Sequence, residues 1–310
     1  MNANSAGAGS DTARAAAAGT LQVAGVTVRF GGLTALEDVS LTVPPRQVTG
    51  VIGPNGAGKT TLLNVLCGFV RPDSGRLSWD GRELTRLRPR RLAGLGIART
   101  LQGVGLFRRL SVLENVMIGA NCRGRSRFGS ALLGLHWSDR DERALRGMAL
   151  EALAETGIGD LAGRMPGELP YGTQKRVALA RALASAPRLL LLDEPASGLS
   201  ETELAELGGL IRRLASGASV VVVEHHMDLM MSICDTIAVL DFGRVIAAGP
   251  PDRVRADPAV TAAYLGGDDA SGNSHGSGSS GRSASASGSN PPGGTGAPGG
   301  TGDGGDAGRE

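Results

Sequence analysis

Lysine is scarce in this chain of 310 residues, which holds two lysines against thirty arginines. Acidic and basic side chains nearly balance, at 30 against 32, and the formal net charge is +2. A balanced chain lacks the broad basic surface that attracts nucleic acid. Aromatic residues make up 3% of the sequence, which argues against surfaces that stack on bases. We therefore expect no nucleic-acid partner.

Long apolar runs are also missing, because no stretch approaches the roughly 18 apolar residues of a membrane-spanning helix. The three cysteines are odd in number and lack the spacing of a metal site, so we expect reduced thiols in a cytosolic protein. Residues 1–19 lack the basic start and apolar core of a signal peptide. This segment and residues 267–310 are rich in small and polar residues that cannot bury enough apolar surface to become ordered. We expect disordered ends around one folded region, residues 20–266.

What the sequence does contain is a phosphate-binding loop with the spacing G-x-x-x-x-G-K-[ST]. The loop consists of Gly53, Pro54, Asn55, Gly56, Ala57, Gly58, Lys59, Thr60 and Thr61. The apolar run Val48–Ile52 predicts a buried strand before it, and the apolar positions after it predict a helix from Thr60 to about Gly68. The glycines let the backbone wrap phosphate oxygens, while Lys59 brings a positive charge to the β- and γ-phosphates. Thr60 offers a hydroxyl to Mg²⁺, so the loop predicts binding of ATP with Mg²⁺.

A second specific pattern is the run Leu189–Leu192, which is followed by Asp193 and Glu194. Four leucines predict a strand buried on both faces, and its carboxyl end reaches the edge where open α/β sheets bind ligands. Burying two acidic residues there without a task would be costly. Because neighbours on an extended strand point oppositely, we predict different roles for the two carboxylates. Asp193 is placed to hold Mg²⁺ through water, and Glu194 to polarise the water that attacks the γ-phosphate.

Three further features are ambiguous on their own. Phe30 could stack on a nucleotide base, but composition alone favours a core position. Leu169–Gln174 precedes a helical pattern at residues 176–184 and fits an anion-accepting helix start or a plain turn equally well. His225 follows the apolar run Ser219–Val223, where phosphate contact and a structural role are about equally expected.

Other segments predict strands and helices but no catalytic or binding residues. Strands at Leu21–Phe30, Leu41–Val43 and Leu77–Trp79 suggest a small antiparallel sheet beside the phosphate loop. Capping boxes that begin at Ser111 and Ser200 each predict the start of a helix.

The order and spacing of these features resemble the ATP-binding cassette of ABC transporters. The resemblance covers about residues 20–266 and rests on the phosphate loop, Gln102, Leu169–Gln174, Leu189–Glu194 and His225. It implies an α/β fold, a P-loop NTPase core with an antiparallel β subdomain and a helical subdomain at about residues 103–175.

The resemblance also implies a role for each ambiguous residue. Phe30 would stack on the base, and His225 would be a switch at the γ-phosphate. Gln102 would sense both Mg²⁺ and the membrane subunit, and would act with Glu194 and His225 in hydrolysis. The signature stretch would close on ATP held by the other subunit; it consists of Leu169, Pro170, Tyr171, Gly172, Thr173 and Gln174.

A narrower resemblance is to the larger, G-type ATPase subunit of branched-chain amino acid importers. It rests on Gly96–Gln102, on Val223–Met227 and on the ending Ala263–Gly266. The chain departs from the family pattern at four positions, where it has Pro170 in place of Ser, Tyr171 in place of Gly, Ser200 in place of Asp or Asn, and His226 in place of Asp. Pro170 removes a hydroxyl that would contact the γ-phosphate, whereas Ser200 can still cap a helix.

The resemblance implies an ATPase that energises import of a branched-chain or other hydrophobic amino acid. Its partners would be a second ATPase subunit, expected to be a sibling chain, membrane permeases and, indirectly, a solute-binding protein. It would lie on the cytoplasmic face of the plasma membrane as a peripheral subunit. The alternatives are urea or amide import, lipopolysaccharide export and a cassette acting on DNA or ribosomes. Cassettes that act on DNA or ribosomes usually contain coiled coils, a second cassette or a basic surface, and this sequence has none of these.

Overall fold

The computed structural model describes residues 19–100, 103–121 and 137–265. Gln102, nearly all of residues 1–19 and the whole tail 267–310 lie outside the described residues, so the predictions for them stay predictions. None of the described helices combines the length and hydropathy needed to cross a membrane.

The described strands form two sheets. A four-stranded antiparallel sheet has the order β2-β1-β4-β5, and a six-stranded sheet has the order β10-β9-β3-β8-β7-β6. The six-stranded sheet is parallel except for its edge strand β10, which runs antiparallel to β9. The strands are β1 (Leu21–Phe30), β2 (Leu33–Val43), β3 (Val48–Ile52), β4 (Ser74–Trp79), β5 (Arg82–Glu83), β6 (Ile97–Arg99), β7 (Leu189–Asp193), β8 (Ser219–Val223), β9 (Thr236–Asp241) and β10 (Arg244–Gly249).

Strand β2 is longer than its sequence pattern predicts. We expected Leu41–Val43, but the strand already begins at Leu33 because it pairs with β1 from Phe30↔Leu33 to Leu21↔Val43. A cross-strand partner supplies hydrogen bonds that a mixed polar sequence does not reveal by itself. The predicted antiparallel sheet is otherwise confirmed.

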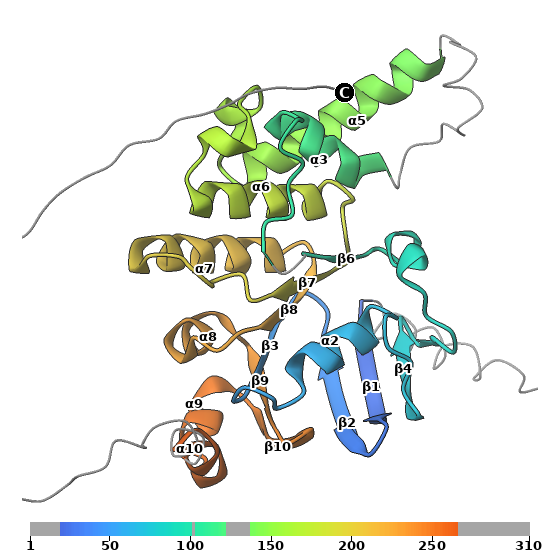
Figure 1. Ribbon diagram of the computed structural model, residues 1–310, viewed down its shortest axis with the longest axis vertical. Coiled ribbons are helices and arrows are strands. Elements are labelled where there is room, and N and C mark those ends of the chain that lie inside the picture. The colour runs from blue at the N-terminus through green and yellow to red at the C-terminus, as the bar shows by residue number, and fades with distance from the viewer. Residues whose placement is uncertain (1–18, 101–102, 122–136, 266–310) are drawn as a thin grey trace, which may run out of the picture. The chain divides into compact units, whose positions relative to one another are not determined.

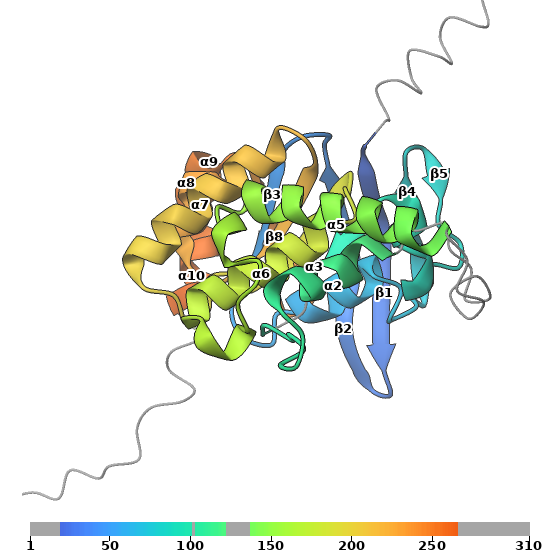
Figure 2. The same ribbon diagram turned by 90° about the horizontal axis from the view of Figure 1, so that it is seen from above.

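Helices flank the six-stranded sheet (Figure 1). Helices α3, α5 and α6 pack on one another and form a group beyond β6 and β7, which Figure 2 shows from above. The helices are α2 (Lys59–Leu66), α3 (Val112–Ala120), α5 (Trp137–Glu155), α6 (Tyr171–Leu183), α7 (Glu201–Ala215), α8 (Met227–Ile233), α9 (Pro251–Arg255) and α10 (Pro258–Leu265). Short 3₁₀ turns are η1 (Pro89–Arg91), η2 (Ala93–Leu95), η4 (Gly159–Leu161) and η5 (Pro166–Glu168). Both predicted capping boxes are present, at the starts of α3 and α7.

The central strands divide their side chains between two apolar cores. Leu190 and Leu192 of β7 face the core shared with α3, α5, α6 and α7. Leu189 and Leu191 face the core shared with α2 and the antiparallel sheet. All of β7 is buried, as expected for a strand covered on both faces. This burial fixes the strand ends, and with them the loops that follow.

Candidate functional site

Three loops leave the six-stranded sheet side by side. Val223 of β8 stands opposite both Val51 of β3 and Asp193 of β7 in the strand register. The ladder continues beyond the strands, since the Glu194 amide donates to the Val223 carbonyl at 2.9 Å and the Glu224 amide donates to the Val51 carbonyl at 3.3 Å. The phosphate loop, Glu194 and Glu224 therefore emerge at one edge of the sheet, the edge that binds ligands in open α/β folds.

The phosphate loop has a backbone that requires glycine at two positions. Gly58 has φ 100°, and a Cβ atom there would come within 2.6 Å of the Ala35 carbonyl oxygen. Gly53 has φ 151°, and a Cβ atom there would collide with the Leu240 carbonyl oxygen. Helix α2 follows directly, with no side-chain cap and no acidic residue in its first turn. Its first N–H groups are thus left for an anion.

Lys59 holds this loop from within. Its Nζ donates to the carbonyl oxygens of Gly53 at 2.7 Å and Pro54 at 2.8 Å, and the residue is 9% exposed. Burial lowers the pKa of the Lys59 amine, and the negative charge of Glu194 acts in the opposite direction. Lys59 therefore stabilises the loop through two hydrogen bonds to the loop's own backbone.

A pocket of about 410 Å³ opens beside the loop. Its walls include Asn55–Thr61, Glu194 and two aromatic side chains, Phe30 and Phe242. Phe30 is 51% exposed, so the core position that composition favoured is wrong. N–H groups, one buried ammonium and an aromatic rim fit a nucleoside triphosphate, with phosphates at the loop and a base at the rim.

Asp193 and Glu194 diverge for a reason other than the one predicted. Glu194 has φ 46° and lies outside β7, so a left-handed turn, not strand alternation, separates the two carboxylates. Asp193 is 5% exposed, and its Oδ2 accepts a hydrogen bond from Arg99 Nη2 at 2.8 Å. Arg99 also donates to Asn64 Oδ1 at 2.9 Å. Sequence reasoning missed Arg99, because only the pairing of β6 with β7 brings it to Asp193.

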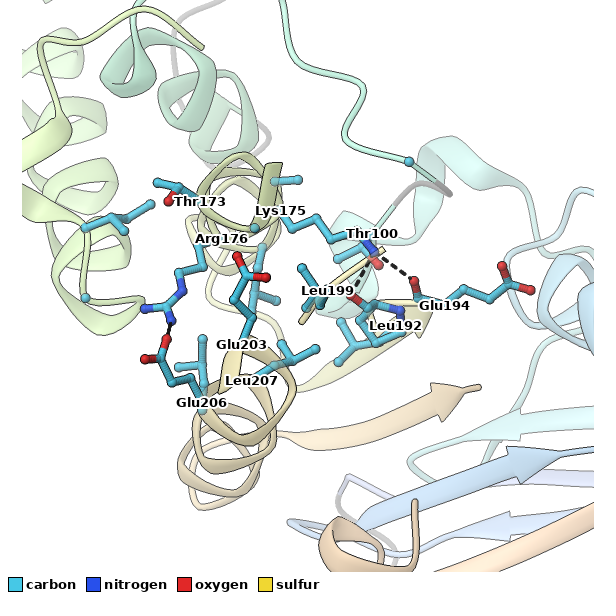
Figure 3. A pocket seen from close by; sticks show the side chains of 18 of the residues that line it. Thr100, Thr173, Lys175, Arg176, Leu192, Glu194, Leu199, Glu203, Glu206 and Leu207 are labelled. Atoms are coloured by element: carbon cyan, nitrogen blue, oxygen red, sulfur yellow. Dashed lines mark hydrogen bonds and ion pairs between the residues drawn. The ribbon is translucent and has the colours of Figure 1, made fainter. Parts of the chain in front are cut away.

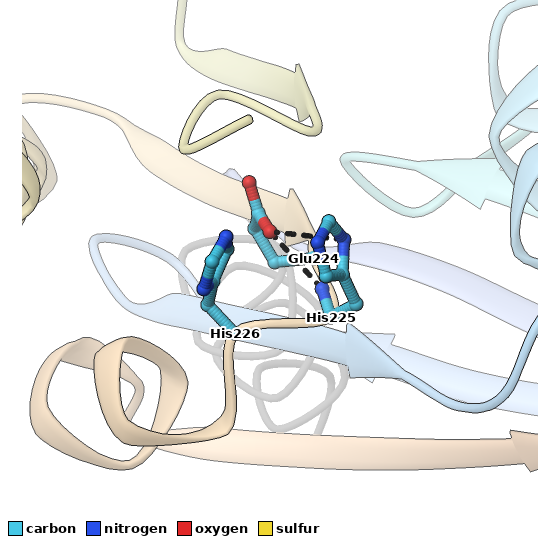
Figure 4. A group of neighbouring side chains, drawn as sticks. All are labelled: Glu224, His225 and His226. Carbon is cyan, nitrogen blue, oxygen red and sulfur yellow. Dashed lines mark hydrogen bonds and ion pairs between the residues drawn. The ribbon is translucent and has the colours of Figure 1, made fainter. Parts of the chain in front are cut away.

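His225 lies at the predicted edge within a cluster of Glu224, His225 and His226 (Figure 4). Glu224 is fully buried, and its oxygens accept from the Ala196 amide at 2.6 Å and the His225 amide at 3.0 Å. The three ligand-type atoms lie within 4.8 Å of one another. Each Glu224 oxygen accepts a backbone hydrogen bond, one from the loop after β7 and one from the loop after β8. The carboxylate therefore connects these two loops. The His225 ring is 52% exposed.

The signature stretch lies apart from this pocket. Of the described residues Leu169–Gln174, none lines the pocket beside the phosphate loop. Helix α6 begins at Tyr171, five residues before the predicted helical pattern, and Pro170 is its N-cap residue, with the non-helical angles φ −55° and ψ 153°. Gly172 is buried, and a Cβ atom there would collide with the Glu203 carboxylate. Gly172 and Thr173 line a different cavity, of about 350 Å³, between α6 and α7 (Figure 3).

Comparisons with known proteins also indicate a nucleotide-binding protein. Residues 36–197 match a family model described as ABC transporter, and residues 244–270 match one described as branched-chain amino acid ATP-binding cassette transporter. The chain belongs to the ABC transporter family. It is an α/β ATPase cassette that binds nucleotide and couples ATP hydrolysis to transport.

Curated relatives match over nearly their whole length. The high-affinity branched-chain amino acid transport ATP-binding protein BraF of Pseudomonas aeruginosa is 41% identical, over 79% of this chain and 97% of BraF. LivG of Escherichia coli, with the same description, is 38% identical over the same shares. The lipopolysaccharide export system ATP-binding protein LptB of Acidithiobacillus ferridurans is 35% identical, over 74% of this chain and 90% of LptB.

Solved cassettes share the fold. The ADP conformation of MJ1267, an ATP-binding cassette of an ABC transporter, superposes with a TM-score of 0.70 and 33% identity. It covers 79% of this chain and 98% of MJ1267. The dimeric bacterial cassette MJ0796 has a TM-score of 0.62 and 26% identity, over 74% of this chain and 98% of its own.

In this cassette, polar side chains of α3 and α6 hold the described part of the segment between β6 and α3. Asn115 is fully buried and donates to the carbonyls of Phe107, Leu110 and Ser111 while accepting from the Phe107 amide. Arg181 of α6 donates to the carbonyl of Gly105 at 2.8 Å. The Phe107 side chain is left 53% exposed on this fixed loop. Asn115 carried no signal in the sequence beyond being a polar residue among apolar helix positions.

Proposed function

We propose that this cassette hydrolyses ATP to drive import of a branched-chain or other hydrophobic amino acid. The match of residues 244–270 to a branched-chain amino acid cassette model supports this solute class, since that segment lies outside the general ABC match. The descriptions of BraF and LivG support it as well. Lipopolysaccharide export is the second candidate, because LptB is also a relative, though at lower identity.

In the proposed site, each side chain has one task. Phe30 stacks on the base, the loop Gly53–Thr61 binds the phosphates, and Lys59 neutralises their charge. Glu194, which lines the same pocket as Lys59, polarises the attacking water. His225 contacts the γ-phosphate from the neighbouring loop. Thr60 and Asp193, with Gln102, would hold Mg²⁺, which supplies charge neutralisation on the phosphates when bound.

We further propose how the cassette is assembled. It works at the cytoplasmic face of the plasma membrane, bound to membrane permeases that receive solute from a binding protein. A second cassette, a sibling chain, completes the site by bringing its own signature stretch to the ATP held here. The position of Leu169–Gln174 away from the chain's own phosphate-loop pocket supports a shared site, and MJ0796 is a dimer.

Uptake in a deletion strain tests the solute class. Cells without the gene should lose uptake of radiolabelled leucine, and the wild-type gene should restore it. A Lys59→Ala gene, expressed at the same level, should not. Unchanged leucine uptake with loss of urea uptake would contradict the amino-acid assignment. A loss of surface lipopolysaccharide alone would favour export.

A further inference from the structure

The second of the two lysines, Lys175, reaches the loop that carries Glu194. It lies on α6, and its Nζ donates to the carbonyl oxygens of Pro195 at 2.9 Å and Glu194 at 3.3 Å. In Figure 3, Lys175 points at the backbone of this loop, whereas the Glu194 carboxylate points away from it. The contact therefore acts on the main chain that carries the carboxylate.

That main chain is in an unfavourable conformation. Glu194 has φ 46°, in the left-handed region that residues other than glycine rarely adopt. Such a conformation persists only when its surroundings hold it. On the amide side, the Glu194 N–H is held by the Val223 carbonyl. On the carbonyl side, Lys175 binds both peptide oxygens that follow the turn.

Lys175 also stands close to the signature stretch. It lies three residues, nearly one helical turn, after Gly172, and its ammonium sits 5.4 Å from the centroid of the Tyr171 ring. Burial lowers the pKa of its amine, opposed by the charges of Glu224 and Glu194. A shift of the first turn of α6 would therefore move the group that holds the Glu194 backbone.

We propose that Lys175 is a positioning residue that holds the Glu194 backbone in its left-handed turn and so aims the carboxylate. This inference rests on the proposed role of Glu194 as the residue that polarises the attacking water. The proposal also links the signature stretch to hydrolysis within one chain, because Gly172 of that stretch and Lys175 both lie at the start of α6. A compact ammonium can meet two consecutive carbonyls, whereas a planar guanidinium has its donors in a fixed fork.

Steady-state ATPase assays with MgATP on the purified full chain, assembled with its sibling cassette, test the proposal. Lys175→Met keeps the length of the side chain and removes the charge and donors. We expect kcat to fall about 10- to 100-fold, because a small misplacement of a reacting group has effects of this size. KM for ATP and the melting temperature should stay close to wild type, and Lys175→Arg should recover part of the loss. Glu206→Gln, which removes the neighbouring α6–α7 ion pair with Arg176, should leave kcat within about twofold.

A double-mutant cycle separates this role from others. If Lys175 acts through Glu194, then Lys175→Met in a Glu194→Gln chain should cause no further loss in single-turnover hydrolysis. A full multiplicative loss would overturn the proposal, as would wild-type kcat in Lys175→Met. A parallel drop in melting temperature and ATP affinity would show a merely structural role. An active Glu194→Gln chain would instead remove the base assignment itself, and the proposal with it.

Discussion

The phosphate loop and the loop after β7 are held in the same way by the chain's only two lysines. Lys59 binds the carbonyls of Gly53 and Pro54, and Lys175 binds those of Glu194 and Pro195. Both loops thus pair a residue of positive φ with a following proline, and one ammonium holds the two consecutive carbonyls. The residue of positive φ differs. It is a glycine where the backbone must approach phosphate, and a glutamate where a carboxylate must face water.

The difference lies in where each lysine comes from. Lys59 is five and six residues from its partners, within the same loop, so the phosphate loop holds itself. Lys175 is 19 and 20 residues from its partners, on a helix of another packing group. On the roles proposed above, nucleotide binding would depend on local structure, while the geometry of hydrolysis would depend on the position of α6. Four substitutions can break or sharpen this contrast.

Glu194→Gln should have the largest effect. It removes the carboxylate that we propose polarises the attacking water but leaves the phosphate loop intact, so kcat should fall by about 100- to 1000-fold. ATP affinity, measured by fluorescence titration, should stay within a few fold of wild type. With ATP and the sibling cassette, light scattering should reveal a stable dimer that dissociates when ATP is removed. Unchanged turnover would disprove the assignment of the base.

Lys59→Ala should act on binding instead. It removes two hydrogen bonds inside the loop and the proposed charge-assisted contact to the β- and γ-phosphates, so ATP affinity should fall by about 100-fold. Titration with ATP and melting with and without ATP measure this. The variant should lose the ATP-induced rise in melting temperature, whereas Glu194→Gln should keep it. Equal ATP affinity in wild type and variant would contradict the proposed binding mode.

Gly172→Asp tests whether α6 faces a partner's nucleotide. Its carboxylate would stand against the γ-phosphate, so dimer formation and hydrolysis should fall by about tenfold or more while monomer ATP binding persists. Any Cβ atom at residue 172 would also collide with Glu203, so Gly172→Ala is the matched control for packing. Gly172→Asp with full activity would refute the shared site. Equal losses in both variants would assign the effect to packing alone.

Phe107→Ala should have the smallest effect on the isolated cassette. The side chain is 53% exposed on a loop held by Asn115, and we expect it to receive a short helix of a permease. Co-purification with the permease should weaken, while ATP binding and melting temperature should change little. Loss of the folded state would show instead that Phe107 belongs to the core.

Local patterns in the sequence predicted the parts of the site that are themselves local. The phosphate loop, the buried strands β3 and β7 and both capping boxes occur where their residues indicated. The contacts of Arg99 with Asp193 and of Lys175 with Glu194 were missed, because each joins residues from separate elements. The left-handed turn at Glu194 was missed as well, since glutamate carries no preference for positive φ.

Both lysine amines are held in hydrogen bonds, so the folded chain should react poorly with reagents that modify amines. Lys59 is buried, Lys175 is half-buried, and each ammonium donates to two carbonyls, so acylating reagents should find little reactive side-chain amine on the folded cassette. A lysine-specific protease likewise has two bonds to cut, one at the start of α2 and one within α6. Cleavage after Lys59 would report opening of the phosphate loop, and cleavage after Lys175 would report release of α6. Two fragment patterns on a gel would thus follow nucleotide binding and helix movement separately in the unmodified protein.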